Sequence, residues 1–92
     1  MRDVGLYLDV DATAHLTEEG RRWAAENGAD CSERGYIFVH VVDDRLYDEE
    51  CVPACLRAVF DEANRRRIYF VLLDDGGGVR VDGVPLVDQD AS

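Results

Sequence analysis

Three mostly apolar runs occur along this chain, and two segments with helical periodicity separate them. The runs occupy residues 4–10, 35–42 and 68–73. Runs of this length that are rich in Val, Ile, Leu and aromatic residues predict β-strands. The run at 35–42 is apolar on both of its sides, which is typical of a central strand that is covered on both faces or well paired.

The two periodic segments predict α-helices between these strands. Thr17 has the side chain and position of an N-cap for a first helix that runs to Asn27, and Gly28 is expected to end it in the left-handed conformation. Trp23 is the expected anchor of this helix in the core. A second helix is expected from Pro53 to about residue 66. Its predicted buried stripe consists of Leu56, Val59, Phe60 and Ala63.

These elements predict one α/β domain. Residues 29–34 are polar and are expected to form a loop, whereas residues 79–81 are expected to form a short fourth strand after a turn at 74–78. The order is then β-α-β-α-β-β, and right-handed crossovers would place both helices on one face of a mixed sheet. We therefore expect a two-layer sandwich with three or four strands, and the length of 92 residues fits a single domain.

The net charge of the chain limits the kinds of partner that it can bind. The chain has twenty acidic and ten basic residues, all of the latter arginine, for a net charge of −10. Such a surface repels nucleic acid and anionic membranes and attracts cationic partners or metal ions. The same composition also arises in GC-rich or salt-adapted genomes, where acidity serves solubility alone.

The cysteines and the chain's hydropathy point to a reducing, cytoplasmic setting. No run approaches 18 apolar residues, and the N-terminus lacks the apolar region of a signal peptide. The chain has three cysteines, Cys31, Cys51 and Cys55. An odd number argues against a disulfide framework. A zinc site would prefer a C-x2-C pair, which this chain lacks, and would need His15 or His40 as its fourth ligand. We therefore interpret the three cysteines as small core residues rather than metal ligands. No cofactor is expected.

The acidic residues gather in the predicted loops and turns, whereas arginines cluster in the predicted helices. B-DNA carries one negative charge per about 1.7 Å of axis, so a length of about 30 Å, the diameter expected for this chain, presents roughly eighteen. Carboxylates concentrated on one side of the protein would approach the charge density of the duplex. Their field would steer the protein onto a basic channel. The residues expected to contact such a partner are Asp43, Asp44, Asp48, Glu49, Glu50, Asp74 and Asp75.

One short motif favours a different function. Asp9, Asp11 and Thr13 form the pattern D-x-D-x-T after an apolar strand, which resembles the first motif of the haloacid-dehalogenase-like phosphatases. Asp74 and Asp75 resemble the acidic pair that binds magnesium in that family. The resemblance implies Mg²⁺-dependent phosphoryl transfer or phosphate binding through Asp9, Asp11 and Asp75. The family also requires a lysine and a longer catalytic core, and this chain has no lysine.

Longer segments carry a second resemblance. The segments ATAHLTEE (12–19), GYIFVHV (35–41) and DG…VDGVPLVD (75–88) resemble a small uncharacterised α/β family carried by phages and plasmids. In size and acidity the chain is also similar to anti-CRISPR and other anti-defence inhibitors. These resemblances imply a phage- or mobile-element-encoded inhibitor rather than an enzyme. It would act in the host cytoplasm, as a monomer or dimer, by occupying the nucleic-acid-binding channel of a basic defence effector.

Overall fold

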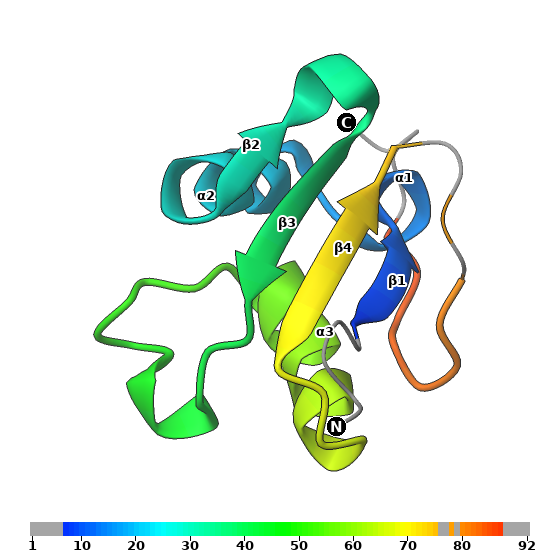
Figure 1. Cartoon of the computed structure of the whole chain (residues 1–92). Coiled ribbons are helices and arrows are strands. Elements are labelled where there is room, and N and C mark those ends of the chain that lie inside the picture. Colours follow the sequence, from blue (N-terminus) through cyan, green and yellow to red (C-terminus); the bar gives the residue numbers. More distant parts are fainter. Residues whose placement is uncertain (1–6, 76–77, 79, 88–92) are drawn as a thin grey trace, which may run out of the picture.

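The computed structural model describes residues 7–75, 78 and 80–87 of the chain. Four strands, three α-helices and two short 3-10 turns follow one another in this part (Figure 1). In chain order they are β1 (Leu8–Asp11), α1 (Ala12–His15), α2 (Glu18–Asn27), β2 (Ala29–Cys31), η1 (Ser32–Arg34), β3 (Tyr36–His40), η2 (Asp44–Leu46), α3 (Ala54–Arg65) and β4 (Phe70–Asp74).

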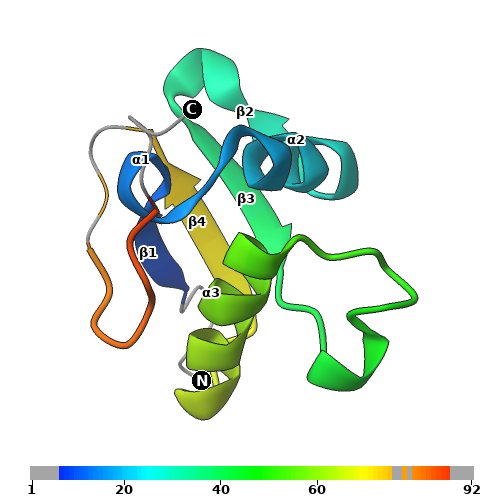
Figure 2. The ribbon, with the colours of Figure 1, turned by 180° about the vertical axis from the view of Figure 1, so that it is seen from behind.

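The strands form one mixed sheet in the order β1-β4-β3-β2. Strand β4 pairs parallel with β1 and antiparallel with β3, and β2 pairs antiparallel with β3. Helices α2 and α3 both lie behind the sheet in Figure 1, and Figure 2 shows them in front of it from the opposite side. The predicted α/β architecture, with a mixed sheet and two main helices on one face, is therefore confirmed.

The fourth strand differs from the prediction. It is β2 (Ala29–Cys31), in the segment expected to be a loop, whereas Arg80 and Val81 lie outside any strand and residue 79 lies outside the described residues. Gly28 explains this arrangement. Its φ of −121° is extended rather than left-handed, and a Cβ atom there would overlap the Val39 side chain and the Phe38 carbonyl oxygen. Glycine thus lets the chain leave α2 and pair at once beside β3.

The orientation of β3 also departs from the expected parallel crossovers. Its last residue, His40, lies opposite Phe70 at the start of β4. The amide of Val41 donates a 2.8 Å hydrogen bond to the carbonyl oxygen of Tyr69, so α3 returns the chain to the end of the sheet that β3 has just reached. Strand β4 therefore runs back beside β3 instead of parallel to it.

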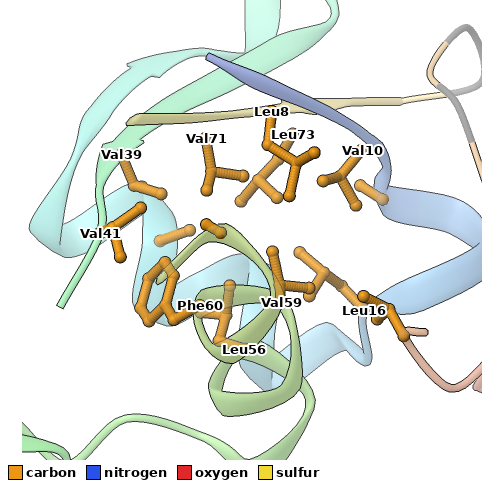
Figure 3. Packing of buried hydrophobic residues seen from close by; sticks show 14 of the residues in the cluster. Leu8, Val10, Leu16, Val39, Val41, Leu56, Val59, Phe60, Val71 and Leu73 are labelled. Atoms are coloured by element: carbon orange, nitrogen blue, oxygen red, sulfur yellow. The ribbon is translucent and has the colours of Figure 1, made fainter. Parts of the chain in front are cut away.

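The core lies between the sheet and the two main helices (Figure 3). Val10, Val71 and Leu73 project from the strands toward Leu56 and Phe60 of α3, and each of these side chains is 1 % exposed or less. Complete burial of such a side chain contributes roughly 1.5–3 kcal/mol to folding. The stripe predicted for the second helix is confirmed, because Leu56, Val59, Phe60 and Ala63 are all buried.

The first helix is anchored as its sequence predicts. Thr17 caps α2 by accepting a 3.2 Å hydrogen bond from the amide of Gly20. The Trp23 ring meets Phe60 edge-on with centroids 6.1 Å apart, which fixes α2 against α3. Within the described residues, no helix is both long and apolar enough to span a bilayer.

Candidate functional site

The strongest concentration of charge is the acidic loop, which we define as residues 43–50. Its five carboxylates belong to residues that are all exposed: Asp43, Asp44, Asp48, Glu49 and Glu50. The loop follows β3 and projects away from the sheet (Figure 1). It therefore presents a dense negative surface in which neighbouring like charges must be held together against their repulsion.

Local hydrogen bonds fix the first half of the acidic loop. The Asp43 carboxylate accepts from the Arg45 backbone amide at 2.9 Å and from two nitrogens of the Arg45 guanidinium at 3.1 and 3.0 Å. These hydrogen bonds and the charge of Arg45 hold the pKa of Asp43 well below its usual range. Asp43 thereby caps the turn η2 and remains ionised throughout the physiological range.

Both main helices hold the second half of the loop. Tyr47 is 8 % exposed, and its hydroxyl donates a 2.6 Å hydrogen bond to Asp61 of α3. The Trp23 indole of α2 donates to the Glu50 carbonyl oxygen at 2.9 Å. Arg57 of α3 donates to the Asp48 carboxylate at 3.1 Å, although that carboxylate stays 95 % exposed. The loop is thus attached at three points while its charges face solvent.

A hollow of about 300 Å³ lies between the acidic loop and α3. It is lined by Asp43, Asp44, Asp61, Asn64 and Arg65. Three of these five side chains are carboxylates, so the hollow suits a cationic side chain of a partner. Among the described residues, no three His, Cys, Asp or Glu side chains group closely enough to hold a metal ion.

The other acidic residues of interest lie at the far end of the sheet. Asp74 pairs with Tyr36 at the start of β3, whereas the acidic loop follows the end of β3. The seven predicted contact residues therefore form two groups, one at each end of β3. The antiparallel orientation of β3 is the physical cause, because it carries residues 43–50 away from Asp74 and Asp75. The contact of these residues with a partner stays a prediction.

The D-x-D-x-T segment does meet the second acidic pair. Parallel pairing of β1 with β4 sets Asp11 opposite Asp74. The Thr13 hydroxyl donates a 3.0 Å hydrogen bond to Asp75, and Arg21 lies 3.6 Å from the same carboxylate oxygen. A cavity of about 350 Å³ opens beside this group, between α2 and the sheet, and Arg21, Arg22 and Asp75 are among its lining residues.

Asp9 differs from the other carboxylates because it sits among apolar neighbours on the sheet. Its Cα partner across the parallel pair is Leu72. One carboxylate oxygen, Oδ1, is buried and has no hydrogen-bond partner within the described residues. Burial, followed by the nearby charge of Asp74, raises the pKa of Asp9 above its usual value.

The structure also reveals an apolar surface that the sequence analysis missed. Both main helices pack on one face of the sheet, and no described helix covers the other. This open face carries the rings of Tyr7, Phe38, His40 and Phe70. The signal was available in the runs at 35–42 and 68–73, which are apolar on both sides although only one side is covered.

The histidines and cysteines occupy separate environments. His15 is buried, accepts the Val81 amide on Nε2 at 2.9 Å and donates from Nδ1 to the Pro85 carbonyl oxygen at 3.0 Å. His40 is exposed on the open face. The cysteines are all free thiols. Cys55 is half-buried and packs against the core, whereas Cys31 is half-buried and Cys51 is exposed, so the predicted core position is wrong for Cys51. No family model, curated protein or solved structure shows a significant match to this chain.

Proposed function

We propose that this chain is a binding protein, not an enzyme, which occupies the basic nucleic-acid-binding channel of another protein by presenting charge as DNA does. The observation that carries the proposal is the fixed conformation of the acidic loop. Its charges are already gathered before binding, so a partner gains the attraction without ordering a flexible segment. The resemblance in size and acidity to anti-defence inhibitors supports the channel of an anti-phage defence effector as the class of partner.

The two acidic groups support this interpretation together. Five residues of a strand span about 17 Å, so the groups at the two ends of β3 lie roughly five base-pair rises apart along a duplex. A channel lined by lysine and arginine for a length of DNA would contact both groups. Attraction of this kind accelerates association and weakens steeply with salt.

A capture experiment tests the proposal. The tagged protein is immobilised and exposed to a nuclease-treated bacterial lysate at low and at high salt. The matched bait carries Asp48→Lys, Glu49→Lys and Glu50→Lys. A control bait carries the same change of charge at exposed carboxylates outside the loop, through Glu18→Lys, Glu33→Lys and Asp82→Lys.

The proposal expects a DNA-binding complex on the wild-type and control baits and none on the loop variant. Salt and added duplex DNA should both release it, because the DNA and the loop would occupy the same channel. Equal recovery on all three baits would exclude the acidic loop as the contact surface. An empty wild-type bait at low salt would contradict the proposal for that host.

A second candidate function is Mg²⁺-dependent phosphoryl transfer or phosphate binding. The observation that favours it is the pairing of Asp11 with Asp74 beside a cavity that Arg21 and Arg22 help to line. Carboxylates suit Mg²⁺, and guanidinium groups suit phosphate. This function predicts a rise in melting temperature with Mg²⁺ and inorganic phosphate that Asp75→Asn removes, because Asp75 lines the cavity. An unchanged melting temperature would reject it.

A further inference from the structure

The open face of the sheet carries a connected set of aromatic rings. Phe38 stacks on Phe70 with centroids 5.4 Å apart, and His40 meets Phe70 edge-on at 5.2 Å. Tyr7 approaches Phe38 edge-on at 6.3 Å. These contacts fix the rings as a preformed surface, and rigid aromatic side chains lose little conformational entropy when they bind.

This aromatic surface is exposed in an otherwise highly charged protein. Tyr7 is 46 % exposed and Phe70 is 37 % exposed. Each precedes a residue that is buried in the core, so both lie on the opposite side of the sheet. Leaving such rings in water forfeits hydrophobic stabilisation, and contiguous apolar patches mark interaction sites. A partner that covers them is therefore expected.

Area and charge argue against a second copy as that partner. Four strands about 4.8 Å apart, the longest of them about 17 Å long, make a face of at most roughly 300 Å². A stable interface takes about 800 Å² from each partner. Two chains that each carry a net charge of −10 would also repel one another.

Asp9 indicates the chemistry of the occupant. It lies on the same face, two residues after Tyr7 in the chain and opposite Leu72 in the sheet, and it is half-buried there. A half-buried carboxylate beside aromatic rings favours a partner with a cationic donor. Asp74 pairs with Tyr36 beyond one end of the aromatic surface, and the acidic loop follows the other end.

We propose that the open face binds an arginine-bearing surface of the basic partner. Guanidinium planes lie on the rings of Phe38 and Phe70, and their forked N–H groups reach Asp9. Arginine fits better than lysine because its planar, weakly hydrated cation stacks on aromatic faces. This inference rests on the proposed function and adds an aromatic centre between the two acidic groups. Protein interfaces commonly have such an apolar centre surrounded by a polar rim.

Peptides of equal charge test the inference with the chain alone. Nona-arginine and nona-lysine are titrated into the wild-type protein, into the double variant Tyr7→Ser/Phe70→Ser and into the control Tyr69→Ser. Tyr69 is an exposed aromatic residue that precedes β4. We expect nona-arginine to bind the wild type and the control about five-fold more tightly than nona-lysine, and the double variant to bind both alike. Amide shifts of Phe38 and Leu72 should report the arginine-specific contact.

Equal binding of the two peptides to the wild type would overturn the inference, as would an arginine preference that the double variant retains with a native circular-dichroism spectrum. Sedimentation supplies a separate check. A wild-type dimer that Phe70→Ser converts to a monomer would identify a second copy as the occupant and would also overturn it.

The loop variant Asp48→Lys/Glu49→Lys/Glu50→Lys separates this inference from the proposed function. It should weaken both peptides to a similar degree and keep the preference for arginine. If it binds both as tightly as the wild type does, the acidic loop fails as a contact while the aromatic site stands.

Discussion

The Tyr47 hydroxyl lies 2.6 Å from a carboxylate oxygen of Asp61, and this hydrogen bond joins the acidic loop to the middle of α3. It opposes the mutual repulsion of the five loop carboxylates, which would otherwise spread the loop apart. Burial, and then the hydrogen bond and charge of Asp61, raise the pKa of Tyr47 well above its usual value. The phenol is therefore held in its neutral, donating form.

The variant Tyr47→Phe tests this anchor. It removes the donor and keeps most of the buried ring, so we expect the free energy of unfolding at pH 7 to fall by about 1 kcal/mol. The pH dependence has a definite sign. Since the folded pKa is raised, the contribution of Tyr47 is complete below pH 10 and is lost as pH rises above it. Urea denaturation at pH 7 and at about pH 10.5 should show the wild-type advantage shrinking. An advantage that grows with pH would contradict the assignment, and Tyr69→Phe is the control.

Asp9→Asn is expected to stabilise the protein at pH 7. The substitution removes a partly buried charge whose Oδ1 has no partner within the described residues, and a gain of a few tenths to about 1 kcal/mol follows. The raised pKa means that the penalty is absent below the ordinary value of 3.8 and grows as pH rises through the folded value. Thermal melts at about pH 3 and at pH 7 check this, and a loss of stability at pH 7 would show that Asp9 has a stabilising partner.

Buried His15 is expected to secure the chain that follows β4. It bonds Val81 and Pro85 at its two ring nitrogens, and the variant His15→Ala loses both bonds and leaves a cavity. The free energy of unfolding should fall by about 2–4 kcal/mol. Hydrogen exchange should show rapid loss of protection at the Val81 amide. A cost below about 0.5 kcal/mol, similar to that of His40→Ala on the exposed face, would contradict this role.

Charge reversal in the acidic loop should leave the fold intact. Asp48, Glu49 and Glu50 are exposed, and the exposed pair between Asp48 and Arg57 contributes little. We expect Asp48→Lys/Glu49→Lys/Glu50→Lys to change the free energy of unfolding by less than about 1 kcal/mol. A melt in high salt checks this. A loss of several kcal/mol in the free energy of unfolding would contradict this and would show that the loop carboxylates stabilise the fold.

The two main helices were predictable because their signals are local, whereas the short helix α1 (Ala12–His15) was not predicted. Thr17 is the side chain that an N-cap needs, and the stripe from Leu56 to Ala63 has the spacing of one buried helical face. The edge strand β2 gave no such signal. It contains only three residues with little apolar character, and it forms because Gly28 lets the chain turn directly onto β3.

The arrangement of the candidate sites was less predictable than their composition. The runs that became β3 and β4 are apolar on both sides, so their pattern does not distinguish parallel from antiparallel pairing or a covered face from an open one. Orientation depends on Val41 meeting Tyr69, a contact between residues far apart in the chain. That contact sets the antiparallel pairing that separates the acidic loop from Asp74.

Competition with DNA tests the central claim most directly. Labelled duplex DNA is bound to the purified partner recovered by the wild-type bait, and the chain is titrated in at fixed salt. We expect the wild type to displace the duplex completely, whereas Asp48→Lys/Glu49→Lys/Glu50→Lys displaces none at the same concentrations. A ternary complex that retains the duplex, or displacement by the variant as effective as by the wild type, would contradict the claim that the acidic loop takes the place of DNA.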